Sequence, residues 1–201
     1  MRIAVINEVS SREKNDKVLE ALKGLPDIEV FNVGMSSQGD EPELTYIHTG
    51  LMAAIALNSG AADMVVGGCG TGQGFLISAM QYPGVFCGLI TEPLDAWLFS
   101  QINAGNCVSL ALNKGFGWAA DINLKYIFEK LFADPMGQGY PLHRAKSQGE
   151  SREKLTVINA NTHKDFQSVL DGIDHELVEH VFTHTPFKEF IESYGKNEFI
   201  Y

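Results

Sequence analysis

The sequence predicts an α/β protein: a doubly wound, Rossmann-like, three-layer domain with a five-stranded parallel sheet, followed by a mostly helical C-terminal extension. Short apolar runs alternate with segments of helical periodicity from residue 2 to about residue 133. The apolar runs are continuous, as in parallel strands that are buried on both faces. The chain has 201 residues, of which 45% are hydrophobic, enough for one domain with a sizeable core.

Each element has its own local signal. Proline at position 93 suits a helix start, while "NSG" (58–60) and "YPG" (82–84) are typical helix ends. The composition of "SSQGDEPE" (36–43) indicates a surface loop. The predicted strands cover residues 2–7, 28–34, 63–69, 85–90 and 106–112. The predicted helices cover residues 13–23, 45–59, 73–81, 92–103 and 118–133.

The composition changes near residue 134, so we divide the chain into a domain at 1–134 and a linker with extension at 135–201. The segment 134–154 is rich in glycine, proline and charge, which predicts a loop or linker. Beyond it we expect a short strand and three helices, which pack on the main domain or on a partner subunit. These elements are predicted at 155–160, 163–172, 174–183 and 186–194.

Charge and cysteine content limit the function classes. The formal net charge of −10 argues against nucleic acid or an anionic membrane as a partner. No apolar run approaches the roughly 18–20 residues of a membrane span.

The N-terminus has no signal-peptide pattern and the cysteines number three, an odd count, so we expect reduced thiols and a cytoplasmic protein. Cys87 and Cys107 lie in apolar runs and are interpreted as core residues. No metal-ligand spacing is present, and no metal is expected.

The third predicted strand ends in a cysteine that a glycine-rich turn follows, "DMVVGGCGTGQG" (63–74). In the common strand order 2-1-3-4-5, strands 1 and 3 flank the switch point where ligands bind, outside the carboxyl ends. Glu8 follows strand 1 and Cys69 ends strand 3, so topology alone brings them together. The turn offers unpaired N–H groups that would stabilise an anion and favour a thiolate. The alternative is a tight turn with a merely buried cysteine.

The stretch "GCGTGQG" (68–74) and the segment that follows it to residue 112 resemble the ribose-5-phosphate isomerase B and galactose-6-phosphate isomerase family. The family pattern is C-G-T-G-x-G, a turn such as P-G, a strand, E/D-P, a helix and H-N-x-x-N-V. "RIAVINE" (2–8) and "TYIHTGLMAAIALNSGAAD" (45–63) stand at the expected places upstream. The resemblance covers roughly residues 2–133.

The resemblance implies an aldose–ketose isomerisation of a sugar phosphate through a cis-enediolate, without a cofactor. Cys69 matches the family's base, and Asn103 matches the asparagine of H-N-x-x-N. The Thr71 hydroxyl and the backbone of the glycine turn match the part that stabilises the enediolate oxygens. The turn residues in question are Gly70, Thr71, Gly72, Gln73 and Gly74.

The chain departs from the family at several positions. Glu8-Val9 replaces Asp-His after strand 1, and Ile102 replaces the histidine assigned to ring opening. Asn113-Lys114 replaces an arginine near the end of the fifth strand. His48, whose side chain type suits proton transfer near neutrality, is a candidate replacement for the missing acid/base group.

The phosphate-binding arginines of the family have no match by spacing. Of the four arginines, Arg144 in "LHRAKS" is our candidate anion clamp, because a guanidinium can bind phosphate through two hydrogen bonds. Family members are usually homodimers with shared sites, so we expect a homodimer here. The departures at Val9 and Ile102 keep a second hypothesis open, a homologue that binds a sugar phosphate without isomerising it.

Overall fold

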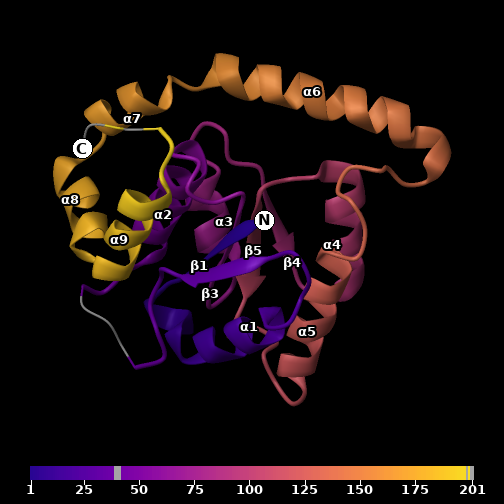
Figure 1. Ribbon diagram of the computed structural model, residues 1–201, viewed down its shortest axis with the longest axis horizontal. Coiled ribbons are helices and arrows are strands. Elements are labelled where there is room, and N and C mark those ends of the chain that lie inside the picture. The colour runs from indigo at the N-terminus through magenta and orange to yellow at the C-terminus, as the bar shows by residue number, and fades with distance from the viewer. Residues whose placement is uncertain (39–41, 198, 200–201) are drawn as a thin grey trace.

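The five predicted strands form a single parallel sheet in a computed structural model that describes residues 1–38, 42–197 and 199. Helices cover both faces of the sheet (Figure 1), so the predicted fold class is confirmed. Part of the expected loop at 36–43 lies outside the described residues. The strands are β1 (Arg2–Asn7), β2 (Glu29–Asn32), β3 (Met64–Cys69), β4 (Cys87–Ile90) and β5 (Cys107–Ala111).

The strand order is β2-β1-β3-β5-β4, so the expected order 2-1-3-4-5 is wrong at its end. β5 pairs with β3 on one side and with β4 on the other. The exchange leaves β4 at the edge of the sheet, where three of its four residues are only half-buried, whereas four of the five β5 residues are buried. The better-buried strand occupies the inner position. As a result the carboxyl end of β5, and not that of β4, lies beside Cys69, which is in register with Ala111.

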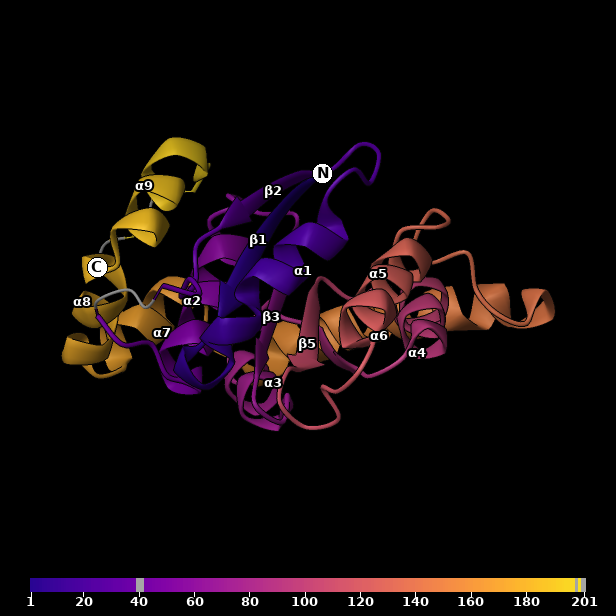
Figure 2. The same ribbon diagram turned by 90° about the horizontal axis from the view of Figure 1, so that it is seen from below.

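The helices of the main domain divide between the two faces (Figures 1 and 2). Side chains of β1 alternate accordingly: Ala4 and Ile6 join the hydrophobic cluster under α2, and Ile3 and Val5 join the cluster under α1 and α5. These helices are α1 (Asn15–Leu22), α2 (Tyr46–Asn58), α3 (Gln73–Ala79), α4 (Pro93–Leu98) and α5 (Ala120–Leu131). A 3-10 helix (Val9–Lys14) precedes α1 and a π-helix (Phe99–Asn103) follows α4.

The segment after α5 differs from its prediction. The expected loop or linker is found over residues 134–144, which include a 3-10 turn (Leu142–Arg144). From residue 145 the prediction is wrong, because one 18-residue helix, α6 (Ala145–Thr162), replaces the rest of the linker and the short strand expected at 155–160. Its sequence is rich in strong helix formers such as Ala, Lys, Gln and Glu, and these preferences dominate over the glycine at position 149. Figure 1 shows α6 along the upper edge of the molecule, joining the α4 side to α7. None of its residues is buried.

Three further helices follow where the periodicity predicts them: α7 (Phe166–Gly172), α8 (His175–Thr183) and α9 (Thr185–Tyr194). Asp165 begins α7 by accepting a hydrogen bond from the Ser168 N–H. These helices pack against α2 and β2, and the Phe190 ring lies 4.9 Å from that of Phe31. Their apolar side chains belong to the same hydrophobic cluster as those of α2.

No helix in the described part of the chain has both the length and the apolar character that crossing a membrane requires.

Candidate functional site

The Cys69 thiol ends β3 and is 5% exposed. The N–H of Gly72 points back at its sulfur with a distance of 3.1 Å, and the Thr71 hydroxyl oxygen lies 3.9 Å from the sulfur. The Thr71 hydroxyl in turn accepts a hydrogen bond from the Gln73 N–H. The turn therefore folds around the thiol and directs a backbone donor at it.

Gly72 makes this turn possible. Its φ of 75° lies in the left-handed region, and a Cβ at this position would meet the Leu89 side chain at 2.5 Å and the Ala111 nitrogen at 3.2 Å. A residue with a side chain would separate the turn from the end of β5. The requirement for glycine at this position is therefore both conformational and steric.

Glu8 and the Cys69 turn are connected through Ser10, a residue that the sequence did not indicate. Glu8 is 4% exposed, and its carboxylate accepts a hydrogen bond from the Ser10 hydroxyl. The same hydroxyl oxygen accepts the Gly70 N–H at 3.0 Å. The structure thus brings Glu8 to the turn, as expected, with a serine between them.

The end of β5 closes the site on its other side. The Asn113 side-chain amide donates to the Ser10 carbonyl oxygen at 2.6 Å, and the Asn113 and Lys114 N–H groups both donate to the Gly70 carbonyl oxygen. The carboxyl ends of β1, β3 and β5 are therefore tied together by hydrogen bonds. The contacts of β5 depend on its inner position in the sheet, which the expected strand order did not provide.

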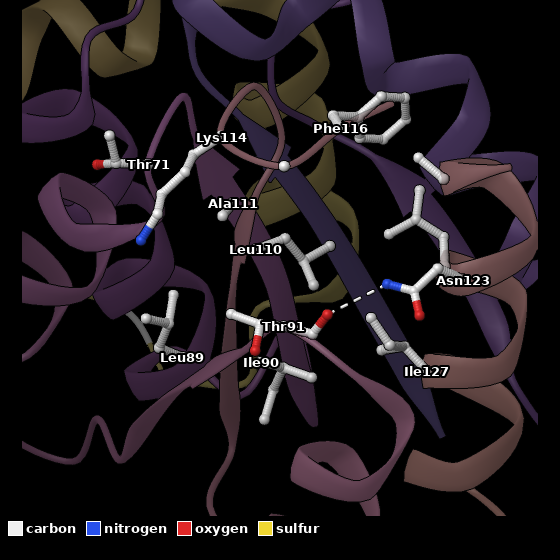
Figure 3. A pocket seen from close by; sticks show the side chains of 13 residues that line it. Thr71, Leu89, Ile90, Thr91, Leu110, Ala111, Lys114, Phe116, Asn123 and Ile127 are labelled. Atoms are coloured by element: carbon white, nitrogen blue, oxygen red, sulfur yellow. Dashed lines mark hydrogen bonds between the residues drawn. The ribbon is translucent and has the colours of Figure 1, made fainter. Parts of the chain in front are cut away.

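A pocket of about 340 Å³ lies between Thr71 and the ends of β4 and β5. Thr71 lines it, whereas Cys69, Glu8 and Ser10 do not. Figure 3 shows the Lys114 side chain extending on the side of the pocket where Thr71 and Leu89 lie. Across the pocket, the Asn123 amide donates to the Thr91 carbonyl oxygen at 3.1 Å. Lys114 places a positive charge beside the turn. In the sequence, Lys114 is part of the Asn113-Lys114 pair that replaces an arginine of the family.

The glycine turn offers fewer donors than the sequence indicates. Of the expected N–H groups of residues 70–74, the Gly70 N–H is taken by Ser10, the Gly72 N–H by Cys69 and the Gln73 N–H by Thr71. Each of these partners is a side chain of the site itself. A bound oxyanion would therefore compete with side chains that already order the turn.

His48 makes its contacts at the start of α2. Its Nδ1 accepts the Thr45 N–H at 3.0 Å, which completes a capping box. One face of its ring stacks on His180 of α8, with ring centres 4.2 Å apart. Burial, and then the proximity of His180, lower the pKa of His48 below its ordinary value of 6.5. A role in proton transfer, which stays a prediction, would fall to its Nε2 atom.

Asn103 and Arg144 do not join Cys69 within one chain. Asn103 comes four residues before β5 begins, at the opposite edge of the sheet from the carboxyl ends. It lines a second cavity of about 580 Å³ together with Arg152 of α6. Arg152 donates to the carbonyl oxygens of Ile102 and Gly137, at 2.9 and 3.0 Å. Arg144 is exposed at the start of α6 and does not line this cavity.

Within residues 1–38, 42–197 and 199, no group of three or more His, Cys, Asp or Glu side chains is placed to hold a metal ion.

The Ribose/Galactose Isomerase family matches residues 3–131. Among solved structures, the chain is similar to a 4-deoxy-L-threo-5-hexosulose-uronate ketol-isomerase complexed with a tartrate, at 44% identity and a TM-score of 0.95, covering 98% of this chain and 94% of that one. It is also similar to a ribose-5-phosphate isomerase from Vibrio parahaemolyticus, at 46% identity and a TM-score of 0.93, covering 98% and 93% of the two chains.

A type B ribose 5-phosphate isomerase of Leishmania infantum shares the fold, at 19% identity and a TM-score of 0.63, and covers 81% of this chain and 98% of its own. No curated protein matches the sequence.

Proposed function

The chain belongs to the ribose/galactose isomerase family, and from this premise we propose that it interconverts an aldose and a ketose through a cis-enediolate, with the Cys69 thiolate as the base. The observation that carries the proposal is the thiol at the end of β3, which accepts the Gly72 N–H at 3.1 Å on a strand that lies between β1 and β5. A base in this position takes the proton from the carbon next to the carbonyl group and returns it to the neighbouring carbon.

The turn around Cys69 supplies the electrostatic part of the reaction. Negative charge develops on the two substrate oxygens when the carbon loses its proton. We assign its stabilisation to the Thr71 hydroxyl and to turn N–H groups that exchange their present side-chain partners for the oxyanion. Glu8 provides the carboxylate at the end of β1, and Gly70, Gly72, Gln73 and Gly74 shape the binding surface. His48 remains a candidate for a further acid/base group through Nε2.

The substrate carries an acidic group. A ribose 5-phosphate has a phosphate, a hexosulose uronate has a carboxylate, and proteins named for both are 44–46% identical to this chain. Lys114, at the mouth of the 340 Å³ pocket beside Thr71, would bind either anion. A sugar phosphate of the ribose-5-phosphate or galactose-6-phosphate type is thus one candidate class.

A second candidate class, the open-chain hexuronates, is favoured by Ile102. This side chain cannot donate or accept the proton that opening a sugar ring requires, at the position where the family has a histidine. A 4-deoxy-5-hexosulose uronate has neither a C4 nor a C5 hydroxyl that could close a ring on C1. A substrate of that kind needs no ring-opening group at C1, so its isomerisation would not require a histidine at position 102.

We further propose a homodimer in which a second copy completes each site. Asn103 and Arg152 lie away from Cys69 in their own chain, in a cavity bounded by α6. The exposed apolar side chains of α6, Leu155, Val157 and Ile158, have exposed fractions of 50, 61 and 54%. Such a surface on a helix with no buried residue suits a partner of the same chain.

The three free thiols support the expected cytoplasmic location.

The test is an isomerase assay against ribose 5-phosphate, galactose 6-phosphate and 4-deoxy-L-threo-5-hexosulose uronate. Cys69→Ala should lower kcat by about 1,000-fold on the substrate that turns over, within the usual range for loss of a general base. Cys107→Ala is the matched control, since Cys107 is buried near the start of β5, away from the turn. Full activity in Cys69→Ala would exclude the assigned base. Binding of all these anions without turnover would favour the non-catalytic homologue.

A further inference from the structure

The Ser10 hydroxyl lies between the buried Glu8 carboxylate and the backbone of the Cys69 turn. We propose that Ser10 is a catalytic residue that carries protons between Glu8 and the two oxygens of the substrate. This inference rests on the proposed isomerase function. It concerns the proton transfer between oxygens, which is separate from the transfer between carbons at Cys69.

The contacts of Ser10 fix both the direction and the capacity of its hydroxyl. A serine hydroxyl has one proton to donate and two lone pairs to accept with. Its proton points at Glu8, and one lone pair accepts the Gly70 N–H at 3.0 Å. The second lone pair can accept a proton from a substrate hydroxyl.

Burial and exposure assign the two roles. The Glu8 side chain is 4% exposed, whereas Ser10 is an exposed residue beside the turn. A substrate held against Cys69 therefore meets the hydroxyl rather than the carboxylate. The Asn113 amide, which donates to the Ser10 carbonyl oxygen at 2.6 Å, holds this segment against the end of β5 and keeps the hydroxyl in place.

The reaction requires such a relay. From aldose to ketose, Cys69 takes the proton on C2 and returns it to C1, while the C2 hydroxyl loses a proton and the C1 oxygen gains one. The C2 hydroxyl proton passes to the Ser10 oxygen as the Ser10 proton passes to Glu8. The reverse path then delivers one proton from Glu8 through Ser10 to the C1 oxygen. The C2–H and O2–H bonds break, the C1–H and O1–H bonds form, and Cys69, Ser10 and Glu8 end as they began.

The alternatives in this part of the chain are occupied or unsuitable. Val9, between Glu8 and Ser10, has no titratable group, and the Thr71 hydroxyl accepts the Gln73 N–H and contacts Cys69 rather than Glu8. His48 is held at the start of α2 by the Thr45 N–H, and its Nε2 stays a candidate for a separate acid/base role. Asn113 offers an amide, which does not exchange its protons on the timescale of catalysis. The Glu8–Ser10 pair is thus the carboxylate and hydroxyl that the fold holds beside Cys69.

The experiment separates the two proton transfers. The three anions of the substrate panel are incubated in D₂O with wild type, Ser10→Ala, Ser10→Thr, Glu8→Gln and Cys69→Ala, and NMR follows both isomerisation and loss of the C2–H signal. Ser10→Ala and Glu8→Gln should lower isomerisation about 100-fold, as loss of general acid–base catalysis does, and retain exchange at C2. Ser10→Thr, which keeps the hydroxyl, should recover most of the isomerisation rate.

Two results would overturn the inference. If Ser10 only orders the turn through the Gly70 N–H, Ser10→Ala lowers exchange and isomerisation by the same factor. If Ser10→Ala isomerises at the wild-type rate, the relay does not operate. Failure of the proposed function gives a different result. Either the wild type shows neither C2–H exchange nor isomerisation on any substrate of the panel, or Cys69→Ala exchanges the C2 proton at the wild-type rate. Circular dichroism of each variant confirms that it is folded.

Discussion

Two neighbouring parts of the C-terminal third, α6 and the α7–α9 unit, relate to the domain in opposite ways. α6 has 18 residues and buries none of them, whereas α7–α9 place Phe166, Leu170, Phe187 and others in the cluster under α2. Both follow the segment 3–131 that matches the family. α7–α9 therefore belong to the core of the single chain, whereas α6 presents a surface and a cavity that we assign to a second copy.

The largest expected effect comes from removing a core side chain of the α7–α9 unit. Phe187 is fully buried, so Phe187→Ala should lower the free energy of unfolding by about 3–5 kcal/mol, the usual cost of a large cavity. Urea unfolding measures this, with Lys188→Ala on the exposed face of α9 as the control. A loss as small as that of the control would mean that α9 is not part of the cooperative core.

The opposite outcome is expected on α6. Leu155→Glu with Ile158→Glu should leave the chain folded, because neither side chain is buried, and should separate the dimer into monomers at micromolar concentration. Light scattering reports the mass, and activity should fall with the dimer. Thr156→Glu adds the same charge at an exposed position of the helix that does not line the cavity. A wild-type monomer, or a double variant that stays dimeric, would contradict the assignment of this surface.

Arg152 is the half-buried residue through which α6 contacts the main domain. Arg152→Gln should lower the free energy of unfolding by about 1–3 kcal/mol, since the carbonyl oxygens of Ile102 and Gly137 lose their charged donor. The change should also raise KM if Arg152 binds substrate in the partner's site. Arg144→Gln, at an exposed residue outside the cavity, is the matched control. Equal effects of the two changes would exclude a special role for Arg152.

The smallest expected effect concerns pH at the contact between α2 and α8. The pKa of His48 is lowered by burial and by His180, so the unfolded chain binds more protons as the solution is acidified. Stability should therefore be complete above the ordinary pKa of 6.5 and fall as the pH drops through and below it. His180→Gln should weaken this acid sensitivity, measured as Tm against pH. An unchanged pH dependence would show that the stacked histidines do not titrate together.

The sequence by itself determined the elements whose signal is local. The apolar runs predicted all five strands, the periodicity predicted α7–α9, and the glycine turn after Cys69 placed the candidate site at the carboxyl end of β3. These features depend on residues within one or two turns of the chain, where backbone preference and side-chain periodicity act directly.

Only the tertiary structure decided which of these elements are neighbours. β4 and β5 are both apolar runs, and their local sequences do not say which of them takes the inner position that β5 has in the sheet. The link from Glu8 through Ser10 to Gly70 joins residues 60 positions apart, and Lys114 reaches the turn because β5 lies beside β3. Asn103, which matches the family's asparagine, lies at the other end of the sheet from Cys69 within one chain. Periodicity shows which side of an element is buried, but it does not show which other element packs against that side. The contacts around Cys69 therefore depend on how the tertiary structure brings the strand ends together.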